Sequence, residues 1–348
     1  MAKYNRQISL GYDKNGNRIR KWAHGNTKSE LNNNIDRIKK EFEEQSNPEN
    51  ITYHTYSEKW LDTYKKSKSP RTYLMYQELV AKTKCLNEYK MHEIKRMDIQ
   101  NIISEYSDRP NTCKKILMCL RQIFKSALVD DIIKKDPTLG IESPKVVPKE
   151  RRALSEKEKA CLLHTKFDQK ERLFINIMLN FGLRPGEALA LTKDSFDFNN
   201  NTVTINKAVT FVNNDPYLKG TKTGVTRTLP IPSQLVPEIK KYLRQCENYL
   251  FERKEAHNGL MTKAAYKHFS DRIFEKINIG LGGSNTDNRL NGMTFYTFRH
   301  NKATALYYID GISLKAKARY MGHSVDMLLK IYSHIDENRE NDDKYNVF

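Results

Sequence analysis

The sequence predicts a multidomain α+β protein with a small β-sheet module, an all-helical domain and a mainly helical domain that holds a small antiparallel sheet. Three observations support this prediction. A chain of 348 residues exceeds the usual size of one domain, so two or three are expected. Strand-like alternation occurs near the N-terminus and again within 202–231, and helical periodicity fills most of the rest. Two prolines and a run of charges interrupt the helical pattern at 141–152, which we interpret as a linker.

Residues 1–45 form the first predicted domain. Apolar and polar side chains alternate over 7–12, Asn15-Gly16 is typical of a tight hairpin turn, and a second strand passes through Ile19 and Trp22. A helix is expected over 29–44. So small a sheet buries little apolar surface. Between Lys3 and Lys21, six basic side chains against one acidic one indicate a surface that lies against DNA. A disordered basic arm is the alternative. The candidate DNA-binding residues are Lys3, Arg6, Lys14, Arg18, Arg20 and Lys21.

Residues 52–140 form the second predicted domain, which is expected to be helical throughout. Trp60, Leu61 and Tyr64 make one apolar stripe, and a second stripe runs from Ile116 to Phe124. Lysines and arginines occupy the opposite faces. The sequence therefore predicts a basic helical domain, followed by the linker at 141–152.

Residues 153–348 form the third predicted domain. Ser155 and Glu158 have the spacing of a capping box, and a buried helix follows through Phe181. Strands are expected at 202–206, 208–212 and 227–231, with a glycine-bounded loop at 220–224 before the last. Helices are expected at 233–250 and 262–277, a loop at 280–291, and helices from there to the end.

The formal net charge of +18 favours a polyanion as partner, because each cation that meets a phosphate releases condensed counterions. A basic surface without a partner is the plainer interpretation. The five cysteines are scattered and include no C-x-x-C pair, which argues against a disulfide framework and a zinc site. No apolar leader and no 18-residue apolar run occur, so we expect a cytoplasmic protein and no membrane association.

Two arginines of the third domain could hold a phosphate. Arg184 lies between Gly182, which is expected to end one helix, and Pro185, which suits the first turn of the next. Arg299 lies in a helix that Thr294 is expected to cap, and its guanidinium group can hold two phosphate oxygens in a fork. Taken alone, Arg184 is equally well explained as a surface residue.

A histidine and a tyrosine could complete the site. His323 follows Gly322, the expected end of a helix over 313–321, so it lies at a fixed corner between helices. Tyr332 lies nine residues later, in a further helix. A phenol becomes a useful nucleophile where cations stabilise the phenolate and its geometry is fixed. With 19 tyrosines in the chain, only the whole set of residues indicates metal-free phosphoryl transfer.

A basic loop supplies the candidate proton donor. Lys222, in the run Lys219–Gly224, has a long stem at the tip of a turn and could protonate a departing 5′ oxygen. Lys219 is a competitor that position alone does not exclude, and a solvated hairpin lysine is the plain alternative.

Together these motifs resemble those of the tyrosine recombinase family, specifically the phage and integrative-element integrases. The matching motifs are Leu183–Glu187, Thr221–Thr223, Phe298–His300, Met321–His323 and Tyr332–His334. The resemblance covers nearly the whole chain. Residues 1–45 resemble the arm-type DNA-binding domain, 52–140 the core-binding domain and 150–340 the catalytic domain.

The resemblance implies a site-specific integrase that cleaves and rejoins DNA strands through a 3′-phosphotyrosyl intermediate and needs no cofactor. Arg184 and Arg299 would stabilise the phosphate, Lys222 would be the general acid, His323 would bond a phosphate oxygen, and Tyr332 would be the nucleophile. It also implies a homotetramer on double-stranded DNA attachment sites, in the cytoplasm of a bacterial host cell. An excisionase and a host DNA-bending protein are implied as further partners. The C-terminal tail would pack on a neighbour, or stay solvated.

One position departs from the family pattern. The family usually has a histidine three residues before the second arginine, where this chain has Tyr296, a far weaker acid or base at neutral pH. Its role is then mainly positional, or His300 or a water takes it over. Tyr296 is disfavoured as the nucleophile, because it lies near a helix start between aromatic core residues.

Two other functions stay open at this point. A non-catalytic DNA-binding regulator is favoured by the altered position at Tyr296. A type IB topoisomerase shares the chemistry, but the separate basic arm favours recombination, since two DNA-contacting regions suit the bridging of distant sites. The element that an integrase would move could be a phage or a conjugative transposon.

Overall fold

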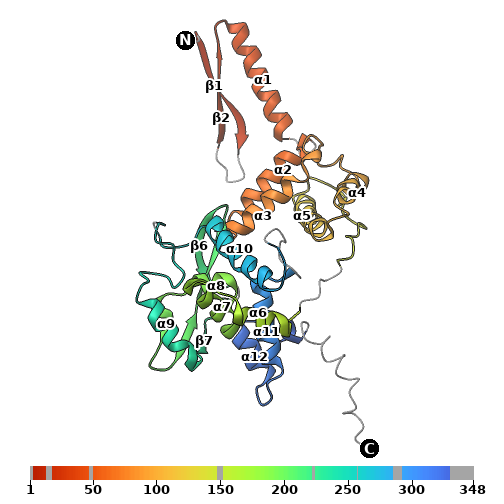
Figure 1. The fold of residues 1–348 in the computed structure, drawn as a ribbon. Coiled ribbons are helices and arrows are strands. Elements are labelled where there is room, and N and C mark those ends of the chain that lie inside the picture. Colours follow the sequence, from red (N-terminus) through yellow and green to blue (C-terminus); the bar gives the residue numbers. More distant parts are fainter. Residues whose placement is uncertain are drawn as a thin grey trace, which may run out of the picture. The chain divides into compact units, whose positions relative to one another are not determined.

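The computed structural model describes residues 3–12, 18–46, 50–146, 152–221, 224–256, 258–284 and 292–329. The chain divides into two compact units, Met1–Pro148 and Lys149–Phe348, and the boundary falls within the predicted linker (Figure 1). The first unit holds two separate hydrophobic cores, one in 8–35 and one in 53–141. The further division of this unit into an arm-type and a core-binding domain stays a prediction.

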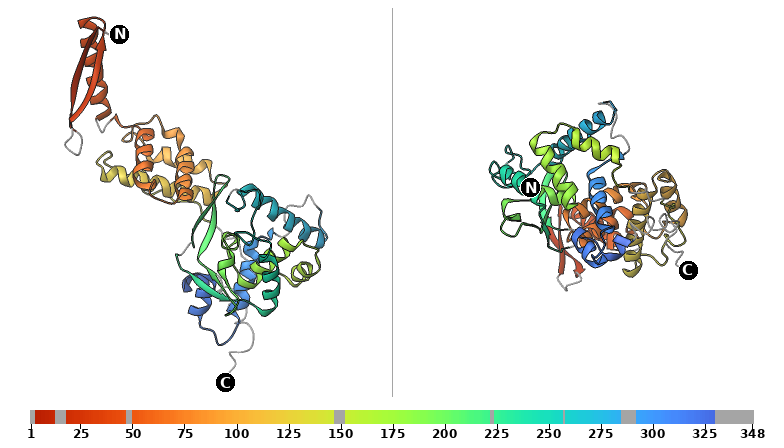
Figure 2. Two further views of the ribbon diagram at one scale, coloured as in Figure 1. Left: turned by 90° about the vertical axis from the view of Figure 1, so that its left-hand side faces the viewer. Right: turned by 60° about the horizontal axis from the view of Figure 1, so that its bottom comes forward.

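The first unit begins with a two-stranded sheet that one helix covers. β1 (Tyr4–Tyr12) pairs antiparallel with β2 (Arg18–Gly25), and α1 (Lys28–Ser46) lies along the sheet (Figures 1 and 2). Ile8, Ala23 and Ile35 make the small core between them. This arrangement confirms the predicted hairpin and helix, while the predicted turn at 15–16 and Lys14 lie outside the described residues.

Four α-helices build the rest of the first unit: α2 (Tyr53–Trp60), α3 (Pro70–Ala81), α4 (Arg96–Glu105) and α5 (Pro110–Val129). The apolar stripe predicted from Ile116 to Phe124 is fully buried, and Trp60 donates its indole N–H to Ser126 Oγ at 3.1 Å. The prediction that 52–140 is helical throughout was wrong at its end. Asp131 adopts a left-handed φ of 56°, which interrupts the helix, and residues 131–146 form irregular structure.

The second unit is mainly helical. Its helices are α6 (Glu156–His164), α7 (Gln169–Phe181), α8 (Pro185–Leu189), α9 (Val236–Leu243), α10 (Lys263–Gly280), α11 (Phe295–Tyr307) and α12 (Leu314–Met321). Its strands are β3 (Phe196–Asp197), β4 (Thr202–Ile205), β5 (Lys207–Val212), β6 (Asp215–Gly220) and β7 (Arg227–Pro230). All strand pairs are antiparallel, with β3-β4-β7 in one sheet and β5-β6 in another.

Two details of the second unit differ from the prediction. β6 was not predicted, because Asp215, Pro216 and Gly220 are poor strand formers; its pairing with β5 through a two-residue turn overrides that preference. The helix expected over 233–250 ends at Leu243, because Tyr249 instead forms a bridge with Thr192. The predicted capping box at the start of α6 is confirmed.

The core of the second unit fixes the parts that carry the candidate residues. Phe174 of α7 packs edge-on against Phe295 of α11, with ring centroids 4.9 Å apart, and Phe298 is completely buried in the same cluster. Because α7 and α11 are in extensive contact, the end of α7 and the middle of α11 are held together. No helix within the described ranges is long and apolar enough to cross a membrane.

Candidate active site

Glu187, in the first turn of α8, lies at the centre of a buried cluster of guanidinium groups. Its Oε2 accepts a hydrogen bond from Arg227 Nη2 at 2.6 Å, and its Oε1 accepts one from Arg184 Nη1 at 2.8 Å. Arg299 Nη1 lies 3.9 Å from Oε2. Burial raises the pKa of this carboxyl group, but the hydrogen bond and charge of Arg227 outweigh burial and lower the pKa to about 2. Glu187 is therefore ionised at neutral pH.

Arg184 is held at the junction between α7 and α8, as the sequence predicted. Gly182 ends α7 with a left-handed φ of 60°, and Pro185 is the first residue of α8. The Arg184 backbone N–H donates to Glu187 Oε2 at 2.9 Å, and its Nη2 donates to the Gly322 carbonyl oxygen at 3.0 Å. Its side chain is 18% exposed, so the guanidinium group is held by these contacts and by Glu187 while part of it stays open to solvent.

Arg299, in α11, joins the ends of two helices. Its Nη1 donates to the Gly182 carbonyl oxygen at 2.6 Å, and its Nη2 donates to the Met321 carbonyl oxygen. These carbonyls belong to the ends of α7 and α12. The last carbonyl groups of a helix have no hydrogen-bond partner within the helix, so Arg299 supplies one. Burial and the nearby Arg184 lower the pKa of Arg299 to about 9, so the group stays charged at neutral pH.

His323 lies directly after the glycine that ends α12, as predicted. Gly322 has a left-handed φ of 62°, and Ser324 Oγ accepts from the Met327 backbone N–H at 3.2 Å at the start of the next helical turn. The ring Nε2 lies 2.8 Å from Arg299 Nη2. Since a guanidinium group can only donate, Nε2 accepts and the ring proton lies on Nδ1. Nδ1 is buried and has no hydrogen-bond partner among the described residues.

The lowered pKa of His323 predicts how the stability of the fold depends on pH. Burial, Arg299 and Arg184 lower its pKa from 6.5 to about 4. In that interval the unfolded chain binds a proton that the folded chain does not, so stability falls as pH drops from 6.5 to 4 and is unaffected by this group above 6.5. The full shift would correspond to about 3 kcal/mol, and because the ring is partly exposed, solvent screening reduces the expected loss to about 2 kcal/mol across the interval. Urea unfolding of the wild type and of His323→Gln measures it; equal slopes in this pH range would contradict the prediction.

Arg227 completes the cluster and was not predicted. Its side chain is 2% exposed and contacts Glu187 through two nitrogens, with Nη1 at 3.4 Å from Oε1. Burial alternates along β7, so Arg227 and Leu229 point inward. A charged side chain at an inward strand position needs a buried partner, and this was the signal in the sequence.

The remaining predicted residues divide into two groups. Tyr296 lies one turn before Arg299 on α11 and is 58% exposed, while its neighbours Phe295 and Phe298 are buried, as expected. His300 is buried. Lys219 lies in β6 and is exposed. Lys222 and Tyr332 lie outside the described residues, but residues 325–329 are helical and Leu328 packs against α12.

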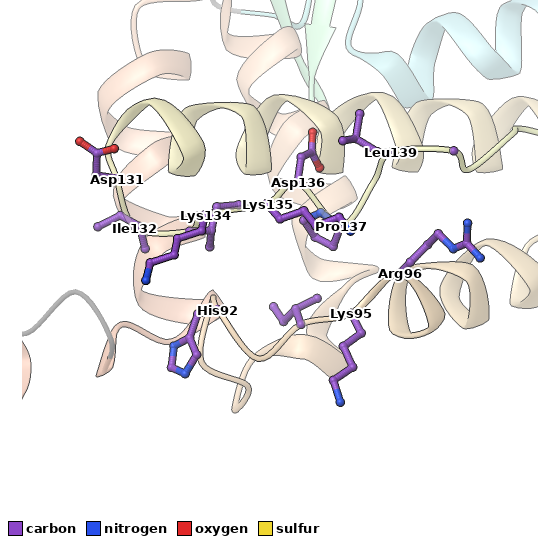
Figure 3. A pocket seen from close by; sticks show the side chains of 13 residues that line it. His92, Lys95, Arg96, Asp131, Ile132, Lys134, Lys135, Asp136, Pro137 and Leu139 are labelled. Carbon is purple, nitrogen blue, oxygen red and sulfur yellow. The ribbon is translucent and has the colours of Figure 1, made fainter.

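A groove of about 1270 Å³ lies elsewhere, in the first unit, between the start of α4 and the segment 131–140. Five basic and two acidic side chains line it, and Figure 3 shows Lys134 and Lys135 on one side with His92 and Lys95 on the other. One of the two carboxylates, Asp136, accepts from Thr138. The groove lacks the arginine and histidine arrangement of the second unit, so its chemistry is that of a basic surface.

The five cysteines all lie in described ranges and are free thiols. Within the residues that the structure describes, no three His, Cys, Asp or Glu side chains are grouped so that they could hold a metal ion.

Sequence comparison relates the chain to known recombinases. Residues 152–339 match the model of the phage integrase family. The chain is 25% identical to a XerC-like tyrosine recombinase of Caldanaerobacter subterraneus subsp. tengcongensis over 371 aligned positions, which cover 95% of the chain and 92% of that protein. It is 24% identical to tyrosine recombinase XerD of Oceanobacillus iheyensis, over 82% of the chain and 91% of that protein.

Solved structures share the fold. The integrase of transposon Tn1549 in complex with a circular intermediate DNA has a TM-score of 0.68 at 20% identity, covering 83% of the chain and 99% of that structure. A lambda integrase dimer bound to a COC′ core site has a TM-score of 0.63 at 15% identity, covering 97% and 94%. The predicted α+β fold is thereby confirmed. Since the family model spans more than half of the chain, the protein belongs to the phage integrase family, the tyrosine recombinases, whose members are enzymes that exchange DNA strands.

Proposed function

We propose that the protein is a site-specific recombinase that integrates or excises a mobile genetic element at DNA attachment sites. One observation carries the proposal: the three guanidinium groups of Arg184, Arg227 and Arg299 surround a single ionised carboxylate beside a neutral histidine. This leaves a surplus of two positive charges in a largely buried site. Such a preorganised site complements a phosphodiester that gains negative charge in its transition state.

Each residue has a proposed role in the strand transfer. Arg184 and Arg299 stabilise the charge on the non-bridging oxygens, and the ring of His323 bonds one of them. Tyr332 releases its phenolic proton to solvent, and its oxygen then attacks the phosphorus and forms a 3′-phosphotyrosyl bond. The bond from phosphorus to the 5′ oxygen breaks, and Lys222 gives that oxygen a proton; Lys219 is the alternative donor. One phosphoester replaces another, so strand exchange needs no ATP.

The lysine variant of Arg299 tests the role of its guanidinium group. An ammonium group cannot reach the Gly182 and Met321 carbonyls and the phosphate together, so Arg299→Lys should slow cleavage by about 10²- to 10³-fold. The rate of covalent complex formation measures the effect. Arg319→Lys, an exposed arginine on α12, is the matched control and should cleave like the wild type. An Arg299→Lys rate above a tenth of the wild-type rate would refute the role.

The first unit is proposed to bind DNA through its basic side chains. Trp22 is 56% exposed, and the sheet face that carries it lies away from the core of Ile8 and Ala23. On this face Arg18 donates to Ser9 Oγ at 3.0 Å. Aromatic and guanidinium groups on an exposed sheet suit contacts to bases and phosphates. The described candidate residues, all exposed, are Lys3, Arg6, Arg18, Arg20 and Lys21.

A homotetramer on DNA is part of the same proposal. It is supported by the likeness to a lambda integrase tetramer bound to a Holliday junction, with a TM-score of 0.61 at 14% identity. An excisionase and a host DNA-bending protein are proposed as further partners on the family resemblance alone.

A chromosomal recombinase of the Xer type is a second candidate, because the relatives described above carry that name. The test is a nicked suicide substrate, from which the cleaved fragment diffuses away and traps the enzyme on DNA. The wild type should form a covalent complex with substrates built on the ends of a mobile element. A complex formed only with substrates built on a chromosomal site, one that is also present in cells without the element, would favour the Xer function. No complex with either would overturn strand transfer.

A further inference from the structure

We infer that Arg227 is a positioning residue for strand transfer. It fixes the carboxylate of Glu187, and Glu187 in turn orients Arg184 toward the phosphate. The inference rests on the proposed function. Arg227 comes from β7, while Glu187 and Arg184 come from the start of α8, so the contact joins the sheet to the helix that carries the phosphate-binding arginine.

Arg227 is placed to act on Glu187 and not on DNA. Both of its terminal nitrogens face the carboxylate, at 2.6 and 3.4 Å. A Cβ atom added at Gly322 would lie only 3.0 Å from Arg227 Nη1, so the backbone of Gly322 covers the guanidinium group. With its side chain 2% exposed, Arg227 cannot meet a phosphate without leaving Glu187.

The contacts of Arg184 explain why it needs this support. Two of its five side-chain N–H groups are used, by Glu187 Oε1 and the Gly322 carbonyl oxygen, which leaves the others for the phosphate. Without Arg227, the buried Glu187 carboxylate would have to be satisfied by Arg184 and by Arg299, whose Nη1 is already 3.9 Å away. Both groups would then be drawn toward the carboxylate and away from DNA.

Packing alone does not account for Arg227. Its Nε is buried and has no hydrogen-bond partner within the described ranges, which costs stability. A buried ion pair is often no more stabilising than apolar side chains of similar volume. The charge of Arg227 is therefore better explained by the charge balance of the site than by the stability of the fold.

The experiment compares Arg227→Met with Arg227→Lys on the suicide substrate. We expect Arg227→Met to slow covalent complex formation by about 100-fold, while the dissociation constant for DNA changes less than about 3-fold, because the side chain does not touch DNA. Arg227→Lys should recover part of the rate, since it restores a positive charge and one hydrogen bond. Arg272→Met, an exposed arginine of the same unit, is the control and should match the wild type.

A double-mutant cycle separates positioning from a general loss of structure. If Arg227 acts through Arg184, removing Arg227 as well should add little: the rate of the double variant Arg184→Met/Arg227→Met should lie within about 3-fold of the rate of Arg184→Met. A neutral methylphosphonate at the cleaved position removes the charge that Arg184 meets, so it should rescue Arg184→Met and Arg227→Met by similar factors. The inference would be overturned if the rate losses of the two single variants multiply in the double variant, or if the methylphosphonate rescues Arg184→Met but not Arg227→Met.

The outcomes distinguish this inference from the proposed function. If the wild type forms no covalent complex, strand transfer itself is wrong. If the wild type forms the covalent complex and Arg227→Met forms it equally fast, only the positioning role is wrong. If thermal unfolding shows that Arg227→Met does not fold, the same cycle is run with Arg227→Lys, for which we expect a loss of about 10-fold; a wild-type rate in that variant would also overturn the inference.

Discussion

Replacing Tyr332 by phenylalanine is expected to abolish the covalent protein–DNA complex. The substitution removes one oxygen atom, and no other group can then form the phosphotyrosyl bond by the proposed route. DNA binding should be unchanged, because the positive charges of the site and of the first unit are kept. Gel electrophoresis of denatured complexes on the suicide substrate measures the loss, and a filter-binding or anisotropy assay measures the affinity.

The matched control is Tyr296→Phe. Tyr296 lies one turn before Arg299 and is exposed, so it is another phenol close to the proposed phosphate-binding site. We expect this variant to keep forming the complex, because a hydrogen bond from Tyr296 would assist the reaction without supplying the nucleophile. The opposite result, with a complex from Tyr332→Phe and none from Tyr296→Phe, would transfer the nucleophile to Tyr296.

Local signals predicted where several of the candidate residues lie in the fold. Arg184 and His323 each follow a helix that ends at a left-handed glycine, and Arg299 lies within a helix whose aromatic residues face the core. Such turns and periodicities are encoded within a few residues, so they can be read from the sequence. The structure adds how these residues meet: Arg299 and His323, separated by 24 positions, are hydrogen-bonded, and Arg184 contacts Gly322 from 138 positions away.

What the sequence did not predict depends on distant contacts. Arg227 matters because it meets Glu187, which lies 40 positions earlier, and no local pattern specifies that partner. β6 forms because β5 pairs with it, although Pro216 disfavours a strand. The helix expected to reach 250 ends early, where Tyr249 bridges Thr192. In each case tertiary pairing overrides the local preference.

Replacing Glu187 by alanine is expected to destabilise the second unit more than any other single substitution considered above. Three guanidinium groups would lose the one carboxylate among them, and removal of one partner from a buried ion pair costs about 3–5 kcal/mol. Urea unfolding at neutral pH measures the loss. Glu255→Ala, which removes an exposed carboxylate paired with Arg253, is the control and should leave the stability essentially unchanged.

The pH dependence tests the same carboxylate in a different way. The folded pKa of Glu187, about 2, lies below its ordinary value of 4.5, so its stabilising effect is complete above pH 4.5 and is lost as the pH falls toward 2. Glu187→Gln keeps the shape and removes this titration, so the variant should lose less stability than the wild type over that interval. The interval lies mostly below that of His323, whose effect is complete by about pH 4. If the wild type and Glu187→Gln lose stability in parallel from pH 4.5 to 2, the carboxylate does not carry the charge balance of the site, and the argument for Arg227 fails with it.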